Sequence, residues 1–195
     1  QYRRKIITVE DPVEFVHENQ KSVILHREVG QHAPDFASAL RGAMRANPDI
    51  LLLGEMRDLE TIRLALQSAT MGILVFGTLH TNNAPKTIDR IIDAFPGDEQ
   101  PQIRMMLSEC LGAVVSQLLC RRIDGLGRVA VHEVLLRTEA IPNAIREGQI
   151  SSLRTIIEGG GDRGMVTMDD SIYRAWADGS ISAEIAYRMA SDKDR

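Results

Sequence analysis

Residues 48–58 read PDILLLGEMRD, and this stretch decides the fold class. Four aliphatic residues, from Ile50 to Leu53, are followed at once by a glycine and a run of charged side chains. An apolar run of this length without alternation is typical of a strand buried on both faces, as in a parallel sheet covered by helices. Charged residues after such a strand lie at its carboxyl end, where open α/β sheets bind their ligands. The stretch therefore predicts an α/β protein with a site at this strand's tip.

Two other segments have the same form, an apolar run that ends in polar residues. Lys5–Val9 precedes Glu10–Pro12, and Ile73–Leu79 precedes His80 and Thr81. If the three strands are parallel neighbours, their polar ends meet at one edge of the sheet. Carboxylates there suit Mg²⁺, which prefers oxygen ligands and keeps several waters. A carboxylate can also orient or deprotonate an attacking water in phosphoryl transfer.

Each polar cluster taken alone also has a structural explanation. An Asp or Glu after a strand often caps the next helix or lies in a solvated turn. A single histidine such as His80 is often a hydrogen-bonded interior residue. The coincidence of three such strand ends favours a phosphate site over three unrelated turns.

Helical periodicity fills most of the remaining chain. One predicted helix begins after Pro34 and ends before Pro48, and a second covers Leu59–Met71. A third carries Ile88, Ile91 and Ile92, and a fourth runs from Glu99 to about Ser116. Residues 15–19 and 22–29 are predicted as a hairpin or two short edge strands, and residues 117–122 and 128–136 as a β-hairpin. Four short helices follow, over about 139–147, 151–158, 168–178 and 182–191. The pattern predicts a core over residues 1–137 and a helical subdomain over 138–195.

Composition excludes several classes of protein. The 23 basic and 27 acidic side chains give a net charge of −4, without the basic patch of a nucleic-acid-binding protein. No apolar run approaches the roughly 20 residues of a membrane-spanning helix, and no cleavable signal pattern is visible. Cys110 and Cys120 form neither a CxxC pair nor a disulfide framework, which favours a reducing cytoplasm.

Three motifs carry a family resemblance. Ile7–Glu14 resembles the Asp box of the secretion ATPase superfamily, Asp49–Asp58 its atypical Walker B segment, and Gly77–Asn82 its His box. Their order and spacing agree, and the resemblance continues through Phe95-Pro96 and Arg128–Glu133, so it covers essentially the whole chain. It implies a partial RecA-like P-loop ATPase core over 1–137, followed by the helical subdomain.

Within this superfamily the chain most resembles the type IV pilus retraction ATPases, the PilT-like group. It lacks the four-cysteine zinc motif that pilus assembly and type II secretion ATPases usually carry. Ala140–Glu147 resembles the retraction signature, although Pro142 and Ala144 replace an arginine and a leucine. The resemblance implies a hexameric motor that hydrolyses ATP with Mg²⁺ to retract type IV pili in twitching motility. It further implies a cytoplasmic homohexamer, peripheral at the inner membrane, which binds a pilus platform protein and neither binds nucleic acid nor spans the membrane.

The same resemblance implies roles for individual residues. Glu10 and Glu55 would serve the nucleotide, one polarising the attacking water and the other holding Mg²⁺ or its water shell. We favour Glu10 as the base and Glu55 as the metal-side carboxylate, and we expect His80 near the γ-phosphate. The further candidates for nucleotide binding are Glu14, Arg41, Arg45, Asp58 and Thr81. The two arginines could instead face a neighbouring subunit or form a solvated helix surface.

No G-x-x-x-x-G-K-[ST] loop occurs in the sequence. Such a loop supplies most of the phosphate contacts in P-loop proteins, and in the resembling family it precedes the Asp box. We therefore expect this chain to be the C-terminal part of a longer motor, inactive and a poor nucleotide binder when alone. Other interpretations remain open: an accessory retraction ATPase, a type II or type IV secretion motor, a non-hydrolytic ring-forming remnant, and, less favoured by the charge, a nucleic-acid translocase.

Overall fold

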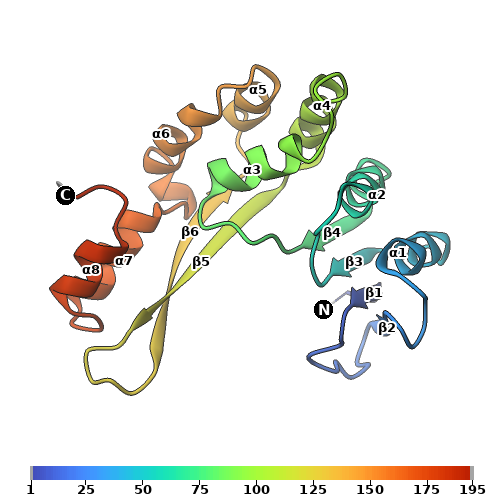
Figure 1. The fold of residues 1–195 in the computed structure, drawn as a ribbon, viewed down its shortest axis with the longest axis horizontal. Coiled ribbons are helices and arrows are strands. Elements are labelled where there is room, and N and C mark those ends of the chain that lie inside the picture. The colour runs from blue at the N-terminus through green and yellow to red at the C-terminus, as the bar shows by residue number, and fades with distance from the viewer. Residues whose placement is uncertain (1, 194–195) are drawn as a thin grey trace. The chain divides into compact units, whose positions relative to one another are not determined.

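The computed structural model describes residues 2–193. Its contacts divide the chain into two compact units, Gln1–His80 and Thr81–Arg195, and Figure 1 shows the elements of each. The predicted boundary between residues 137 and 138 falls inside the second unit, after β6 (Arg128–Leu136) and before α5 (Ala140–Arg146). That division into core and subdomain stays a prediction.

The first unit is a parallel four-stranded sheet with two helices. Its strands, in the order β2-β1-β3-β4, are β1 (Lys5–Glu10), β2 (Val23–Glu28), β3 (Ile50–Leu53) and β4 (Leu74–Gly77). All three strand pairs are parallel, as predicted. The alternative of a hairpin over residues 15–29 is wrong, because residues 15–19 form no strand. Of the two edge strands in the other alternative only the second is present, as β2, which pairs in parallel with β1. The twelve residues between them give the length that a parallel connection needs.

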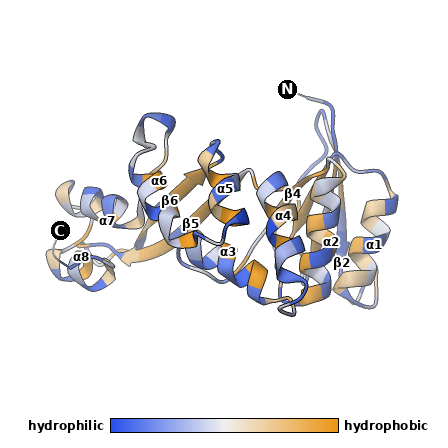
Figure 2. Ribbon diagram, turned by 90° about the horizontal axis from the view of Figure 1, so that it is seen from above, coloured by the Kyte–Doolittle hydropathy of each residue, from blue (hydrophilic) through white to orange (hydrophobic). Residues whose placement is uncertain are grey.

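Helices α1 (Phe36–Arg45) and α2 (Leu59–Thr70) bury the core of this unit. The core residues from the sheet are Ile7, Val9, Leu51 and Leu53, and those from the helices are Ala39, Leu40, Ala43 and Ala65. Figure 2 shows that both helices alternate apolar and polar residues, which suits helices packed on one side.

The other face of the sheet is apolar along β3 and β4 but only partly covered there. Ile50 and Leu52 of β3 are half-buried, and their cross-strand partners Leu74 and Phe76 are 53% and 54% exposed. The prediction that the strand beginning at Ile50 is buried on both faces is therefore wrong for the described residues. Leu51 and Leu53 are buried while their neighbours are not, because successive side chains point to opposite faces.

The second unit combines a long antiparallel hairpin with helices. Its elements are α3 (Ala84–Asp93), α4 (Gln100–Cys110), β5 (Ala113–Arg121), β6, α5, α6 (Leu153–Glu158), α7 (Met168–Ala177) and α8 (Ala183–Met189), with 3₁₀ turns η1 (Ile150–Ser152) and η2 (Gly161–Arg163). The predicted hairpin is present, and its first strand begins four residues earlier than expected. No helix among residues 2–193 is long and apolar enough to cross a membrane.

Helix α4 is shorter than its sequence pattern predicts. It ends at Cys110, whereas the expected helix ran to about Ser116. The Arg137 guanidinium donates from Nη1 to the backbone oxygens of Ser108, Glu109 and Leu111, at 3.1, 2.9 and 3.0 Å. These carbonyls lie where a helix end needs partners, so a residue distant in sequence decides where the helix stops.

Candidate functional site

The carboxyl ends of β1, β3 and β4 lie next to one another. Val9 pairs with Leu53, which in turn pairs with Gly77. Beyond these last paired residues the Gly54 amide donates to the Val9 oxygen at 2.8 Å, and the Met56 amide to the Thr78 oxygen at 3.0 Å. The polar residues that follow the three strands therefore share one edge of the sheet, as the sequence predicted.

Gly54 permits a close approach between two of these strand ends. A Cβ atom at this position would lie 3.3 Å from Glu10 Cα and 3.4 Å from the Val9 oxygen. The contact with Glu10 Cα is tighter than a side chain ordinarily makes, and as a backbone atom this Cα cannot readily move aside; the contact with the Val9 oxygen is at the limit of ordinary van der Waals distance. Glycine at the end of β3 therefore sets how near the two carboxylate-bearing segments can come.

Glu55 is held in its ionised form by two basic neighbours. Its Oε1 pairs with the Arg57 guanidinium, and its Oε2 lies 3.3 Å from His80 Nε2. The hydrogen bond from Arg57 is the largest cause of a lowered pKa for this carboxyl, and the His80 contact lowers the pKa further. Glu55 is 17% exposed while His80 is 88% exposed, so the carboxylate is sheltered and the imidazole faces solvent. The structure brings together two of the three predicted catalytic residues.

Glu10 has a different environment, formed by a residue that sequence reasoning missed. Its Oε1 lies 3.5 Å from His26 Nδ1 on the neighbouring strand β2, and its side chain is 13% exposed. The same nitrogen lies 3.0 Å from Thr8 Oγ1. The sequence indicates that Thr8 shares a face of the strand with Glu10, because the two residues are two apart. His26 joins the site only through the pairing register of β1 and β2, which the sequence does not specify.

Asp58 has a capping role in the structure. It is the N-cap of α2 and accepts from the Thr61 amide at 2.8 Å and from Thr61 Oγ1 at 2.9 Å. Both carboxylate oxygens are thus engaged, which corresponds to the structural explanation considered for acidic residues after strands. Its predicted contact with nucleotide stays a prediction.

The predicted arginines lie on α1. Arg41 pairs with Glu60 of α2, both side chains being about half exposed, and it contacts Ser38 Oγ at 3.4 Å. Arg45 lies exposed in the last turn of α1. Among residues 2–193, no hydrogen bond or ion pair joins either arginine to Glu10 or Glu55, so the helix-surface alternative stays open.

The last two candidates lie outside strands. Glu14 is exposed in the connection after β1. Thr81 begins the second unit, where its Oγ1 lies 2.7 Å from Thr87 Oγ1 of α3. The positions of Glu14 and Thr81 do not test their predicted contacts with nucleotide, which stay predictions.

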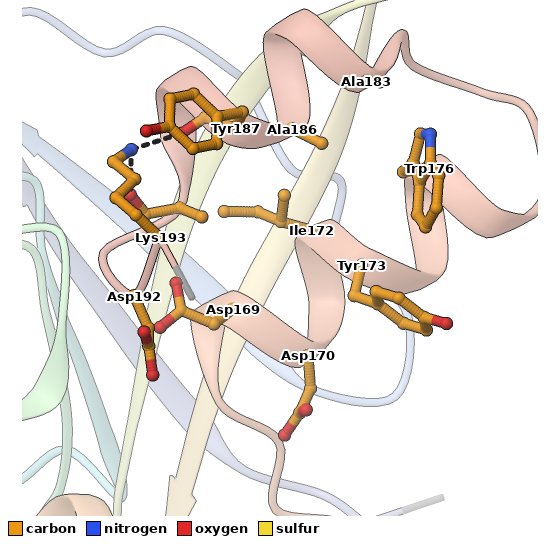
Figure 3. A pocket seen from close by; sticks show the side chains of 11 residues that line it. Asp169, Asp170, Ile172, Tyr173, Trp176, Ala183, Ala186, Tyr187, Asp192 and Lys193 are labelled. Atoms are coloured by element: carbon orange, nitrogen blue, oxygen red, sulfur yellow. Dashed lines mark hydrogen bonds between the residues drawn. The ribbon is translucent and has the colours of Figure 1, made fainter. Parts of the chain in front are cut away.

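A separate hollow of about 420 Å³ lies between α7 and α8 in the second unit (Figure 3). Tyr173, Trp176 and Tyr187 line it. Its carboxylates already have partners within the protein: Asp169 accepts from Arg154 and from the Ser191 amide, at 3.2 and 2.7 Å. The hollow therefore presents aromatic surface rather than a free charged group, and it holds none of the predicted catalytic residues.

Solved structures of similar fold define the class of protein. The crystal structure of the pilus retraction motor PilT with bound ADP superimposes with a TM-score of 0.90 and 43% identity, over 98% of this chain and 54% of that one. The ATPase DotB of Legionella pneumophila gives a TM-score of 0.85 and 29% identity, over 96% of this chain and 51% of that one. The fold is the C-terminal part of a RecA-like ATPase core, as the sequence predicted.

Sequence comparison then identifies the family. The model of the type II/IV secretion system protein family matches residues 1–128, and the chain belongs to this family. A twitching motility protein of Neisseria gonorrhoeae is 50% identical over 97% of this chain, which covers 50% of the relative. The type IV pilus retraction ATPase PilT of Pseudomonas aeruginosa is 52% identical over 95% of this chain, which covers 54% of the relative. The chain thus spans about half the length of these relatives.

Proposed function

We propose that the intact protein containing this chain is an ATPase that drives type IV pilus retraction, and that this chain supplies its catalytic carboxylates. One observation carries the proposal: Glu10 and Glu55 follow neighbouring parallel strands at the ligand-binding edge of a RecA-like sheet. The similarity to retraction motors at about half identity favours retraction over secretion.

The two carboxylates differ in surroundings, which supports different roles for them. Glu10 is sheltered, and in the described part of the chain the only basic side chain paired with it is His26, whose charge depends on protonation, so it is the better candidate for orienting or deprotonating the attacking water. Glu55 is held ionised by Arg57 and His80. A bound Mg²⁺ would neutralise charge on the phosphates.

The donor set fits this metal. Within residues 2–193 no group of three metal-ligating side chains is present. Mg²⁺ bound with nucleotide characteristically takes one or two protein carboxylates and completes its shell with phosphate oxygens and water. Glu55 at the strand end meets that requirement, directly or through water.

The finer assignments also belong to this proposal. Glu14, Arg41, Arg45, Asp58 and Thr81 would assist nucleotide binding. The motor would be a cytoplasmic homohexamer at the inner membrane and would act on a pilus platform protein. The domain division proposed is an ATPase core over 1–137 and a helical subdomain over 138–195.

Phosphate release by the intact protein tests this function. Glu10→Gln should lower kcat by about 100-fold or more, because removing a catalytic acid–base group typically costs 10²–10⁴-fold. Glu55→Gln should also lower kcat, because it removes the carboxylate proposed to hold Mg²⁺ or its water shell. Glu18→Gln, in the exposed connection before β2, is the matched control and should retain activity. Cells carrying either inactive variant should lose twitching. Normal hydrolysis by both variants would overturn the assignment of the carboxylates, and normal twitching without the protein would overturn the assignment to retraction.

A further inference from the structure

His26 lies beside the proposed catalytic carboxylate through strand pairing. In the parallel register of β1 and β2, Thr8 pairs with His26 and Glu10 with Glu28. Residues two apart on one strand, and cross-strand partners, point to the same face of a sheet. The imidazole therefore lies on the face that carries the Thr8 and Glu10 side chains. Its 16% exposure makes it a sheltered group rather than a surface histidine.

The hydrogen bonds of the ring favour a proton on Nδ1. The backbone amide of His17 donates to His26 Nε2 at 3.1 Å, and the His17 carbonyl oxygen lies 3.4 Å from the same nitrogen. An amide N–H is a donor only and makes the shorter contact, so we assign the lone pair to Nε2 and the proton of the neutral ring to Nδ1. Nδ1–H then faces Thr8 Oγ1 at 3.0 Å and Glu10 Oε1 at 3.5 Å. The hydrogen bond of Nδ1 is made with Thr8 Oγ1, and the Glu10 carboxylate lies beside it, close enough to be attracted by the N–H dipole.

Other contacts hold the ring in this orientation. The His17 ring stacks on the His26 ring, with centroids 6.0 Å apart and an interplanar angle of 17°. Phe15 packs against His17 with a centroid separation of 4.9 Å. Thr8, the other partner of Nδ1, is 2% exposed and pairs with His26 across β1 and β2. A ring fixed by backbone, stacking and a buried hydroxyl can orient a neighbouring side chain.

We propose that His26, as its Nδ1–H tautomer, is a positioning residue that orients the Glu10 carboxylate for catalysis, with the His17 amide selecting the tautomer. This rests on the proposed function, in which Glu10 orients the attacking water. Catalytic groups need support that holds them within about 0.5 Å of the productive geometry, and misplacement by about 1 Å can cost 100-fold in rate.

The tautomer can be measured on the 195-residue chain itself. Two-bond ¹H–¹⁵N correlation spectra distinguish protonated from unprotonated ring nitrogens, and the His26→Leu variant assigns the signal by its loss. We expect the neutral ring of His26 to carry its proton on Nδ1. A neutral ring protonated on Nε2 would overturn the inference, because the His17 amide would then have no acceptor there.

Kinetics of the intact protein test the positioning role. His26→Leu removes the Nδ1–H group and should lower kcat by about tenfold or more, with KM for ATP changed by less than about twofold. His26→Asn restores an N–H donor near the position of Nδ1 and should recover kcat to within about threefold of wild type. Thermal unfolding of each variant separates this effect from loss of fold. Equal activity of His26→Leu and wild type, or equal loss in the two variants at equal stability, would contradict the role.

A double variant distinguishes failure of this inference from failure of the proposed function. If His26 acts through Glu10, then adding His26→Leu to Glu10→Gln should cause no further loss of kcat. If Glu10→Gln alone leaves kcat unchanged, the proposed function of Glu10 fails, whatever the tautomer. If Glu10→Gln is inactive and His26→Leu is fully active, the function of Glu10 stands and the positioning role is overturned.

Discussion

Glu10 and Glu55 show how two carboxylates at one sheet edge acquire different chemistry. Glu55 pairs with Arg57 and lies 3.3 Å from His80, and its pKa is lowered chiefly by the arginine hydrogen bond. Glu10 instead faces an imidazole and a threonine hydroxyl on its own side of the sheet. Pairs of titratable groups in unlike surroundings are a common basis for dividing catalytic roles.

The relative position of the two carboxylates depends on Gly54, because a single methyl group added there would contact the backbone of Glu10. Gly54→Ala should place its Cβ 3.3 Å from Glu10 Cα and displace the catalytic strand end. We expect kcat of the intact protein to fall by about tenfold or more, since small displacements of catalytic groups are costly.

The matched control for this change is Gly97→Ala. A Cβ at Gly97 meets no atom within 4 Å, so this variant should retain wild-type hydrolysis. Phosphate release measures both. Equal activity of the Gly54 variant and the control would show that the approach of the two strands does not position Glu10.

At the scale of elements, buried polar side chains tie separate parts of the second unit together. Glu133 of β6 is 7% exposed. Its Oε1 accepts from the Ala84 amide at 2.7 Å, and its Oε2 from the Met168 amide at 3.3 Å. These amides belong to the first residues of α3 and α7, where helices lack internal acceptors and favour negative charge.

Replacing Glu133 should therefore destabilise the protein through two helices at once. Glu133→Ala leaves two buried amides without this acceptor, and at about 1–3 kcal/mol for each unsatisfied buried donor we expect a loss of roughly 2–6 kcal/mol in the free energy of unfolding. Glu133→Gln keeps one acceptor oxygen and should lose less.

Chemical denaturation of the 195-residue chain measures these differences. Glu139→Ala is the control, because Glu139 is exposed and makes no side-chain cap hydrogen bond to α5. A Glu133→Ala variant as stable as this control would mean that water or another group replaces the carboxylate at both helix ends.

For the molecule as a whole, the partly covered face of the sheet is an apolar surface of the first unit. Leu74 and Phe76 are about half exposed on β4, which lies at one end of the sheet order. Exposed apolar side chains along an edge strand promote association between molecules.

Substitution on this face should change association more than stability. We expect Leu74→Thr with Phe76→Thr to raise the concentration at which the 195-residue chain associates, with little change in its unfolding midpoint, because threonine keeps the strand preference. Light scattering and thermal unfolding measure the two effects. Leu51→Thr, on the fully buried face, should instead lower the midpoint strongly. Unchanged association in the double variant would show that this face does not mediate it.

Local patterns in the sequence were sufficient for much of the fold. The run from Ile50 to Leu53, the prolines and the caps predicted strands and helices close to those observed, because periodicity and capping are local properties. The parallel pairing of residues 22–29 with β1 was not predictable, since no local sequence pattern there distinguishes a hairpin from a parallel pair. The end of α4 was also missed because Arg137, far along the chain, binds its last carbonyls.

The sequence by itself determined the class of the molecule and which strand ends carry carboxylates. An apolar run followed by charged residues is a local pattern, so it can be recognised without knowing which strands pair. Only the tertiary structure decided that Arg57 and His80 both contact Glu55 and that His26 faces Glu10. The physical reason is register. Glu10 and His26 meet because the parallel register of β1 and β2 pairs His26 with Thr8, two residues before Glu10. A shift of this register by one residue would turn the His26 side chain to the opposite face of the sheet.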